Sequence, residues 1–466
     1  MNEIIYTSAT KLAEMIRGKQ VSPSEVLDAY IQRIDAVNPR LSAFVTLSLD
    51  QARDAAHASE ARIAKGEPLG ALEGVPVSIK DTIETAGIRT VSGTRLHEFH
   101  VPTADAPVVT RLKQAGAVIL GKTNVPEIAM DLRTENPVFG RTSNPWNLTR
   151  VPGGSSGGEA ASIAAGCSAA GVGSDMGGSI RVPAHFCGIA GLKPTPGRVP
   201  GSGHFPNAAT GPFALGTSTG PLARRVEDLE LLFKVLIGFD AADPMSVPLP
   251  WRDSSDTTRV MFYTNDGISP VTAETREAVE RAASALADAG AEVIERRPAE
   301  IERSHDLWSR FLSEPGWPGT MSLYKEHEEL MGPLIKAMTK MPREGNMERY
   351  LSAWSSRDKL RASVVAEMME YPIMLAPVAS IPAFAHGHRG KFDVDGELVG
   401  YLEAFSYVQA YNLLGLPVTV VRCGMSPEGL PIGVQVIGRP WDEERTLRAA
   451  AVIEAAVGEY LRPVGI

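Results

Sequence analysis

The spacing of apolar residues predicts helices and strands in alternation. Residues 26–37 carry apolar side chains at helical spacing, and Ser-Pro-Ser-Glu at residues 22–25 has the pattern of a capping box with proline in the first turn. The sequence therefore predicts a helix that begins at this box and ends at residues 38–39. Residues 109–120 and 279–294 each show a helical pattern, a glycine and a short apolar run, which indicates a helix followed by a strand.

A strand is also predicted at residues 75–79, where a mostly apolar run follows Gly74 and ends at Lys80. Active sites of open α/β sheets gather at the carboxyl ends of strands, so Lys80 is a candidate functional residue. No Ser/Gly linker, charge block or low-complexity tract divides the chain. We therefore expect the α/β class and a single domain over residues 1–466, with residues 70–200 as its catalytic core.

The composition is that of a globular protein and narrows the range of functions. The chain has 466 residues, 44% of them hydrophobic and 22% charged, and its formal net charge is −9. This balance gives no basic footprint for a polyanion, so we expect no nucleic-acid partner. Three widely spaced cysteines favour a reducing compartment, and no apolar run has the length of a signal peptide or a membrane span. We expect a cytoplasmic protein without a membrane span.

Glycine is concentrated in one window that carries few charges. Residues 151–200 hold 12 of the 44 glycines and only five charged side chains. Within this window, residues 153–181 read GGSSGGEAASIAAGCSAAGVGSDMGGSIR, in which a small-residue helix and a strand separate two glycine-flanked serine sites. The pattern predicts a buried site that is built largely from backbone.

The turn at residues 176–179 is a candidate oxyanion site. Gly177 and Gly178 leave successive backbone N–H groups unobstructed before a predicted helix, and such a concavity attracts negative charge. Ser179 lies at its rim, where its hydroxyl could attack a carbonyl carbon. The N–H groups of Met176, Gly177, Gly178 and Ser179 would then receive the developing oxyanion. A phosphate- or carboxylate-binding site fits the same spacing.

Lys80 is the candidate base for this nucleophile, because none of the nine histidines has a distinctive sequence setting. At a strand end in a sparsely charged environment, desolvation favours the neutral amine. Activity near neutral pH requires a lysine pKa well below the ordinary value of about 10.4. The alternative is an exposed lysine paired with Asp81.

Three motif matches are set aside because their context is wrong. Residues 116–123 fit the letters of a phosphate-binding loop, but the middle residues are themselves a predicted strand. Residues 153–157 fit the nucleophile elbow G-x-S-x-G, yet no buried strand precedes them. His386 and His388 lack acidic or cysteine partners at ligand spacing, so we expect no metal and no cofactor.

Residues 305–375 are rich in methionine and aromatic side chains and hold eight of the 15 methionines. Flexible thioethers beside aromatic rings suit an adaptable apolar cap over a substrate pocket. A helical layer that packs on the core would have the same composition. Both interpretations stay open.

Several motifs together resemble the amidase signature family. The resemblance covers nearly the whole chain, and residues 240–400 match least. It implies the amidase signature fold, a large central mixed β-sheet that is covered by helices on both faces. The matching motifs are GVPVSIK at residues 74–80, GGSSGG at 153–158, SDMGGSIR at 174–181, FCG at 186–188, GLKPT at 191–195 and GVQVIG at 433–438.

The resemblance also implies roles for individual residues. It places the nucleophile of a Ser–cis-Ser–Lys triad on Ser179 and the base on Lys80. The bridging serine, which follows a cis peptide bond in the family, falls on Ser155. The resemblance further implies that Ser156 and Asp175 support the site by hydrogen bonds.

We therefore expect a cofactor-free serine amidohydrolase that cleaves the C–N bond of carboxylic amides through an acyl-enzyme, with esters or carbamates as further substrates. Met130 and Gly154 are expected to line the substrate pocket. Met130 and residues 305–375 favour an apolar acyl or aryl group, and the resemblance points to the fatty acid amide hydrolase-like and bacterial amidase branch. The expected partners are a small-molecule substrate and, at most, a second copy in a homodimer, since the sequence does not give the oligomeric state.

Two alternatives remain. One is the A subunit of a glutamyl-tRNA amidotransferase, which would need partner subunits and glutamine. The other is a non-catalytic anion-binding protein that uses the same glycine-rich turns. Amide hydrolysis by the chain alone separates the expected enzyme from the first, and covalent labelling of Ser179 separates it from the second.

Overall fold

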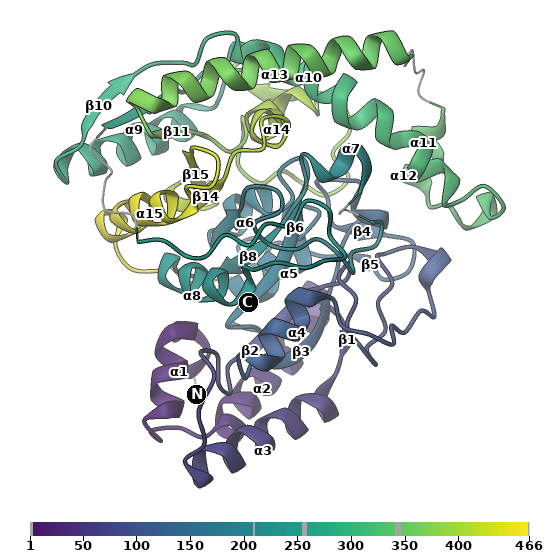
Figure 1. Ribbon diagram of the computed structural model, residues 1–466, viewed down its shortest axis with the longest axis vertical. Helices are drawn as coiled ribbons and strands as arrows, with labels where there is room; N and C mark the ends of the chain where they lie inside the picture. The colour runs from purple at the N-terminus through teal and green to yellow at the C-terminus, as the bar shows by residue number, and fades with distance from the viewer. Residues whose placement is uncertain (1–2, 208–209, 254–258, 341–345, 465) are drawn as a thin grey trace.

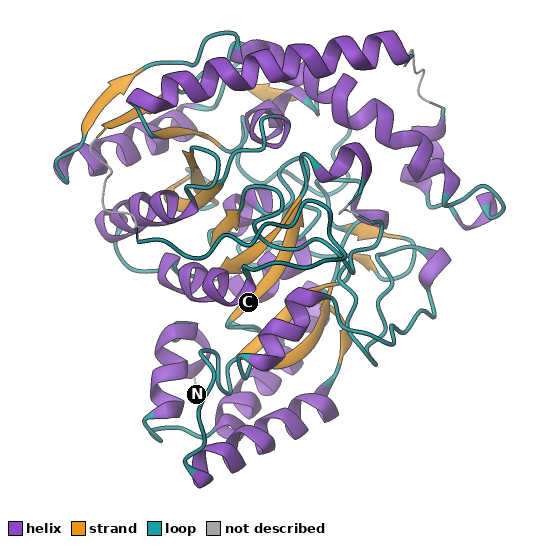
Figure 2. Cartoon of the chain, viewed as in Figure 1, coloured by secondary structure: helices purple, strands orange, loops and turns teal. Residues whose placement is uncertain are grey.

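An eleven-stranded mixed sheet forms the centre of the molecule (Figures 1 and 2). The computed structural model describes residues 3–207, 210–253, 259–340, 346–464 and 466. The strand order is β1-β3-β2-β6-β8-β7-β14-β15-β11-β9-β10, and the pairs β4–β5 and β12–β13 form two small separate sheets. The α/β class that the sequence predicts is confirmed.

The elements have the following bounds. The strands are β1 (Phe44–Leu47), β2 (Pro76–Lys80), β3 (Val118–Thr123), β4 (Glu135–Asn136), β5 (Gly140–Arg141), β6 (Ala170–Asp175), β7 (Ala190–Lys193), β8 (Ser218–Ala223), β9 (Arg259–Phe262), β10 (Glu292–Glu295), β11 (Ile373–Pro377), β12 (Phe392–Val394), β13 (Glu397–Val399), β14 (Val418–Met425) and β15 (Pro431–Gly438). The α-helices are α1 (Ala9–Arg17), α2 (Pro23–Leu41), α3 (Leu49–Lys65), α4 (Pro107–Gln114), α5 (Gly157–Ala164), α6 (Arg181–Cys187), α7 (Gly211–Ala214), α8 (Val226–Leu236), α9 (Ala273–Asp288), α10 (Ser304–Trp308), α11 (Glu314–Ser322), α12 (Pro333–Thr339), α13 (Met347–Glu370), α14 (Ser406–Leu413) and α15 (Glu443–Val457). Short helical turns are η1 (Ile4–Tyr6), η2 (Arg95–His97), η3 (Glu127–Ala129), η4 (Ile301–Arg303), η6 (Glu328–Leu330) and η7 (Glu403–Phe405), and η5 (Ser309–Ser313) is a π-helix.

Helices cover both faces of the sheet (Figure 2). Successive residues of a strand point to opposite faces, and β14 illustrates the result. Val420 packs with the buried side chains of α5 and α6. Its neighbour Val421 packs in the other core with the buried side chains of α8, α9 and α15. The covered sheet that the family resemblance implies is therefore present.

Parallel pairing brings the strands of the candidate site together. β2 lies between β3 and β6 and runs parallel to both. Ile79 pairs with Val172 in this register, so Lys80 lies beside the last residues of β6, which ends at Asp175. Since the carboxyl ends of parallel strands meet at one edge, residues 95 positions apart in sequence reach the same place.

Local sequence signals set several of the elements. The capping box of α2 is present: Glu25 N–H donates to Ser22 Oγ at 3.1 Å, and Ser22 N–H donates to the Glu25 carboxylate at 2.8 Å. The helix continues beyond the predicted end, through Pro39 to Leu41. Pro39 has no N–H and so removes one helical hydrogen bond, and the left-handed Ser42 (φ 52°) ends the helix. The two predicted helix–glycine–strand patterns are α4 with β3 and α9 with β10.

Residues 305–375 are mostly helical and form a layer at one end of the molecule, the upper end in Figure 1. Residues 341–345 of this interval lie outside the described part of the chain. Phe311 and Leu360 from the layer share a hydrophobic core with Ile437 of β15. The layer therefore packs on the sheet, and its role as a cap over the substrate pocket stays a prediction.

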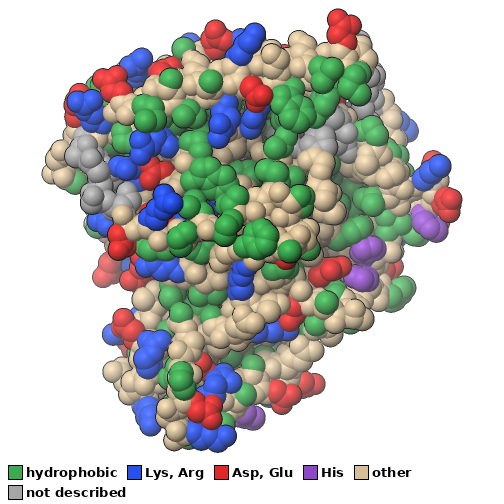
Figure 3. All heavy atoms as spheres, in the orientation of Figure 1, with side chains coloured by type: hydrophobic (Ala, Val, Ile, Leu, Met, Phe, Trp, Pro, Cys, Tyr) green, Lys and Arg blue, Asp and Glu red, His purple; other side chains and the backbone are tan. Residues whose placement is uncertain are grey.

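Charged side chains of both signs are interspersed on the face of the molecule seen in Figure 3, and apolar side chains gather across its middle. Phe99 and Met347 are among the most exposed large apolar side chains, and Met347 shares α13 with the exposed Leu351 and Met369. Among the described residues, no helix combines the length and the apolar character that crossing a bilayer requires.

Candidate active site

Lys80 is completely buried at the end of β2 and is surrounded by hydroxyl groups. Its Nζ lies 2.7 Å from Ser155 Oγ and 2.9 Å from Ser174 Oγ, and it donates to the Ser174 carbonyl at 3.2 Å. Asp81, the alternative partner, instead accepts from the N–H of Val91 at 3.2 Å. The structure thus brings Lys80 and Ser155 together and does not place Lys80 at the surface.

The environment of Lys80 favours its neutral form. Burial lowers the pKa of Lys80 to about 7, against the smaller raising effects of Asp175 and Glu159. At this pKa a large share of the amine is unprotonated near neutral pH, which a general base requires.

Ser155 follows a cis peptide bond from Gly154, immediately before helix α5. A Cβ atom on Gly154 would come within 2.6 Å of the Asp131 carbonyl oxygen and 2.8 Å of the Leu132 carbonyl carbon. Gly154 therefore packs against backbone and is not among the residues that line the pocket. That Gly154 belongs to the substrate pocket stays a prediction.

Asp175 organises the turn that leads into α6. Its carboxylate accepts from the N–H of Gly178 at 2.9 Å and of Ile180 at 3.0 Å, and from Asn412 Nδ2 at 3.0 Å. The Arg181 guanidinium donates to both carboxylate oxygens, at 3.0 and 2.9 Å. Although burial opposes it, Arg181 and these donors hold the pKa of Asp175 well below its usual range. Asp175 is thus a fixed anion that shapes the turn.

One predicted oxyanion donor is already engaged. The N–H of Gly178 donates to the Asp175 carboxylate at 2.9 Å, and its part in an oxyanion hole stays a prediction. Within the described part of the chain, no backbone hydrogen bond outside the strand ladders uses the N–H groups of Met176, Gly177 or Ser179. These three groups remain available to bind an oxyanion.

Ser155 and Ser179 lie at the same pocket but are not bonded to each other. Both line the pocket, and the N–H of Ser156 donates to the Ser179 carbonyl at 3.1 Å, which ties the two segments together. Among the hydrogen bonds of the described residues, none joins the hydroxyls of Ser155 and Ser179. Catalytic hydrogen bonds are often long without substrate and shorten in its complex. Ser156 Oγ donates to the Ser174 carbonyl at 3.4 Å.

The pocket beside these serines is lined by apolar and polar residues in nearly equal number. Met130 lines it, as the sequence predicts, and Thr320 of α11 brings the helical layer to its wall. The only ionisable side chain on the described part of its lining is His204. The remaining lining residues are Ile128, Ala129, Ser174, Met176, Pro206, Asn207, Phe213 and Thr217.

Sequence reasoning missed Glu159, which is fully buried behind Lys80. Its carboxylate accepts from the hydroxyls of Ser78 and Thr123, and burial raises its pKa to about 7. Gly171 makes room for it, since a Cβ atom there would overlap the Glu159 carboxylate. The sequence did contain a signal for this residue, because Glu159 is an acidic residue in a predicted helix of otherwise small residues.

Sequence reasoning also gave His204 no role. The His204 ring lies 2.8 Å from Ser174 Oγ and thereby joins the hydrogen bonds around Lys80. No sequence signal marks this contact, because it joins a loop to a strand end.

The motif matches that we set aside have other structural roles. Residues 118–123 of the apparent phosphate loop form strand β3, and Lys122 is buried with its Nζ 3.0 Å from Thr85 Oγ1. The His388 ring stacks on Phe392 at 4.5 Å. The described residues contain no group of three His, Cys, Asp or Glu side chains that could hold a metal ion.

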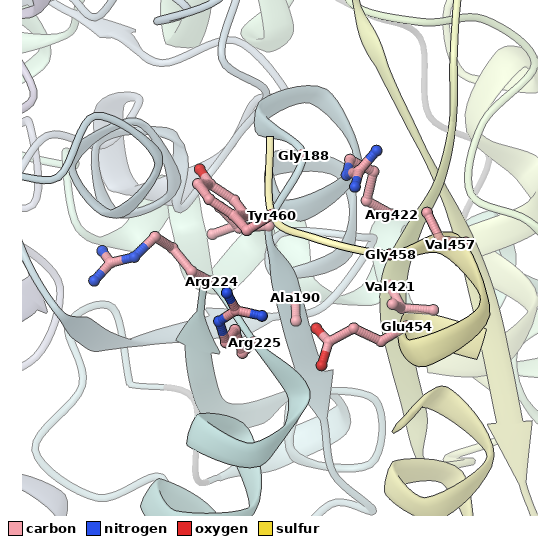
Figure 4. Close-up of a pocket in the computed structure, with 11 residues that line it drawn as sticks. Gly188, Ala190, Arg224, Arg225, Val421, Arg422, Glu454, Val457, Gly458 and Tyr460 are labelled. Atoms are coloured by element: carbon pink, nitrogen blue, oxygen red, sulfur yellow. The ribbon is translucent and has the colours of Figure 1, made fainter. Parts of the chain in front are cut away.

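A second cavity lies between β14 and the segment that contains Arg224 (Figure 4). Arg224 donates to three backbone carbonyls, at 3.0, 2.7 and 3.0 Å, and Glu454 accepts from the N–H of Val226 at 3.0 Å. None of the predicted site residues lines this cavity. It is therefore not the candidate active site.

A mixed α/β sheet that buries a lysine against a serine, beside a second serine in a glycine-rich turn, indicates a serine hydrolase without a histidine base. The family model described as Amidase matches residues 25–447. The chain belongs to this family, the amidase signature enzymes, which cleave carbon–nitrogen bonds of amides. The resemblance seen in the sequence is confirmed.

Known proteins match over nearly their full lengths. The A subunit of Glutamyl-tRNA(Gln) amidotransferase from Heliobacterium modesticaldum is 36% identical over 494 residues, which cover 97% of this chain and 98% of that protein. The structure of a bacterial aryl acylamidase of the amidase signature family is 29% identical, with a TM-score of 0.84 and coverage of 97% and 96%. The structure of a fatty acid amide hydrolase is 25% identical, with a TM-score of 0.86 and coverage of 98% and 86%.

These relatives correct the expected partners. We expected a small-molecule substrate, a homodimer at most and no nucleic acid. That expectation is contradicted by relatives that are named as subunits of a Glutamyl-tRNA(Gln) amidotransferase. The net charge of −9 led to the wrong expectation about partners. Net charge bears on direct binding of a polyanion by the chain, but it carries no information on contacts between subunits.

Proposed function

We propose that the chain cleaves amide C–N bonds through an acyl-enzyme on Ser179, with Ser155 as the proton bridge and Lys80 as the base. The observation that carries the proposal is the buried contact of 2.7 Å between Lys80 Nζ and Ser155 Oγ. A neutral amine at this distance can take the Ser155 proton while Ser155 Oγ takes the proton of Ser179.

The reaction then has two steps, acylation of Ser179 and hydrolysis of the acyl-enzyme. Ser179 Oγ bonds to the amide carbon, and the N–H groups of Met176, Gly177 and Ser179 bind the oxyanion that forms. The proton on Lys80 returns through Ser155 to the leaving nitrogen, and the C–N bond breaks. Water next attacks the acyl carbon and loses its proton to the same relay, which releases the acid and restores Ser179.

We further propose that the chain works as the amide-cleaving subunit of an assembly like that of a glutamyl-tRNA amidotransferase. Identity of 36% over 97% of the chain to the A subunit of Glutamyl-tRNA(Gln) amidotransferase supports this assignment. The amide would then be a donor carboxamide whose nitrogen is released for transfer. A cytoplasmic location agrees with three cysteines that are all free.

A second candidate is the cleavage of amides that carry an apolar acyl or aryl group. The apolar part of the pocket lining, which includes Met130, Met176 and Phe213, supports it. Likeness to a bacterial aryl acylamidase over 97% of the chain supports it as well.

A fluorophosphonate probe followed by peptide mapping tests the mechanism without a known substrate. We expect the label on Ser179, with loss of labelling in Ser179→Ala. A label elsewhere, or none, would contradict the proposed nucleophile and favour a protein that only binds anions.

Product analysis separates the two candidate substrates. The amidotransferase assignment predicts ammonia release from glutamine that increases when partner subunits from a relative's assembly are added. Rapid cleavage of an anilide with no response to glutamine would instead support the apolar candidate. In either case Ser179→Ala provides the inactive control.

A further inference from the structure

A chain of hydrogen bonds runs from Lys80 through Ser174 and His204 to a backbone carbonyl. Lys80 Nζ donates to Ser174 Oγ at 2.9 Å, and Ser174 Oγ lies 2.8 Å from His204 Nε2. On the other side of the ring, Nδ1 lies 2.8 Å from the carbonyl of Pro206. The proposed mechanism uses Lys80 and leaves Ser174 and His204 without a role.

The carbonyl of Pro206 fixes which atom donates and which accepts in each hydrogen bond of this series. A carbonyl can only accept, so the imidazole proton must be on Nδ1 of His204. Nε2 of the neutral ring is then an acceptor and takes the O–H of Ser174. Burial, with the nearby Lys80, lowers the pKa of His204 to about 3, so the ring keeps this neutral form at ordinary pH.

This direction leaves the Lys80 lone pair facing Ser155. A neutral amine has two N–H bonds and one lone pair. With the Ser174 hydroxyl turned to His204, Ser174 Oγ and the Ser174 carbonyl can both accept from Lys80, at 2.9 and 3.2 Å. The remaining position on Nζ, the lone pair, then lies toward Ser155 Oγ at 2.7 Å.

The loop that carries His204 is anchored to the segment after Lys80. The N–H of Phe205 donates to the Thr82 carbonyl at 2.8 Å, and the N–H of Glu84 donates to the Gly203 carbonyl at 2.8 Å. Ser92 Oγ donates to the Phe205 carbonyl at 2.9 Å. The position of the ring relative to Lys80 is therefore fixed by backbone on both sides of it.

We propose that His204 is a positioning residue for amide cleavage, which acts by holding the Ser174 hydroxyl away from the Lys80 lone pair. Without the ring, the Ser174 O–H is free to turn and donate to that lone pair, where it competes with Ser155. This role rests on the proposed function, because it matters only if Lys80 is the base.

The test measures how fast a fluorophosphonate labels Ser179 in wild-type protein, His204→Ala, Ser174→Ala and the double variant. Since one misdirected hydrogen bond is worth about 1 kcal/mol, His204→Ala should label roughly 5- to 10-fold more slowly than wild type. Ser174→Ala removes the hydroxyl that would compete for Lys80, so His204→Ala should cause no further loss when it is added to Ser174→Ala. The double variant should be no slower than either single one, because His204 acts only through Ser174. His204→Gln, whose side-chain oxygen reaches the Nε2 position, should stay within about threefold of wild type.

Other outcomes overturn the role. Losses that multiply in the double variant would mean that His204 acts independently of Ser174, as a structural residue or a substrate contact would. If His204→Gln labels as slowly as His204→Ala, the hydrogen-bond acceptor at the Nε2 position has no role. If His204→Ala does not fold, His204→Asn replaces it in this comparison, because its shorter side chain does not reach the Nε2 position. Wild-type protein without label on Ser179 would overturn the proposed function itself, whereas labelled wild type with an unaffected His204→Ala would overturn only the role of His204.

Discussion

Burial has opposite consequences for neighbouring ionisable side chains, depending on their partners. Lys80 and Asp175 are both buried and lie at the ends of adjacent strands. Lys80 has hydroxyls for near neighbours, and its pKa falls to about 7. Asp175 faces Arg181 and several N–H donors, and its pKa stays well below the usual range. The site thus combines a permanent anion that shapes the turn with an amine that can change its charge near neutral pH.

The pKa of Lys80 predicts the pH dependence of amide cleavage. Below about 7 the amine is protonated and cannot accept the Ser155 proton, so activity should fall as pH decreases through that value. We expect kcat/KM to rise tenfold per pH unit on the acid side and to level off above about 7. A profile that stays flat well below this pH would exclude Lys80 as the base.

Replacement of Glu159 should move the acid limb of this profile, the pH range over which activity falls as pH decreases. The Glu159 carboxylate raises the pKa of Lys80, so Glu159→Gln should shift the limb to lower pH, by up to about one pH unit. Glu454→Gln is the matched control, because burial also raises the pKa of Glu454 to about 7 but this residue lines the cavity of Figure 4. An equal shift in both variants, or a shift to higher pH in Glu159→Gln, would contradict the electrostatic explanation.

At the scale of elements, the site depends on two parallel strands and the glycine turn that follows one of them. Gly178 has φ +103°, and a Cβ atom there would lie 2.6 Å from Val408 Cγ2 and 2.9 Å from Val182 Cγ2. Glycine is therefore required both for the backbone conformation and for the packing of α14 against α6.

Gly178→Ala should accordingly lower the free energy of unfolding by more than backbone strain alone would. We expect a loss of about 1–2 kcal/mol from the left-handed backbone and a further ~1–3 kcal/mol from the clash, in the free energy of unfolding. Gly290→Ala isolates the first contribution, since Gly290 has φ +97° with no atom within 4 Å of its Cβ position. Denaturant unfolding measures both variants, and equal losses would remove the packing argument.

The sequence predicts those elements whose signals are local. The capping box of α2, the strand that ends at Lys80 and the helix–glycine–strand units all depend on residues within one or two turns of each other. Family motifs also locate Ser155 and Ser179, which the structure brings to one pocket. The predicted end of α2 was wrong because the helix continues through Pro39 and ends at the left-handed Ser42.

Contacts between distant segments account for what the sequence could not predict. Glu159 and Ser78 are 81 positions apart, and His204 and Ser174 are 30 apart. The N–H of Gly178 is engaged because Asp175 turns back on its own loop, a detail of side-chain geometry that no motif contains. Each depends on how the strands and loops are packed around the pocket.

At the scale of the molecule, the helical layer touches the candidate oxyanion turn. Trp308 Nε1 donates to the Met176 carbonyl at 3.3 Å, and the Trp308 ring lies 3.2 Å from the Cβ position of Gly177. The layer thus contacts the turn whose N–H groups would bind an oxyanion.

Trp308→Phe should therefore slow the labelling of Ser179 by a fluorophosphonate, by roughly threefold to tenfold, because the turn loses one hydrogen bond and part of its packing. Trp354→Phe is the control within the same layer, since this more exposed side chain packs on Phe311 and Tyr350. Equal rates for Trp308→Phe and wild type would mean that the layer does not influence the turn.

The relay itself is tested most directly by comparing the amide-cleavage rates of Lys80→Ala, Ser155→Ala and the variant that combines both. Groups that pass one proton act as a unit, so each single variant should lose nearly all activity, and the combined variant should be no slower than the worse of the two. Losses that multiply in the combined variant would show that the two residues act separately, which would contradict a proton path from Ser179 through Ser155 to Lys80.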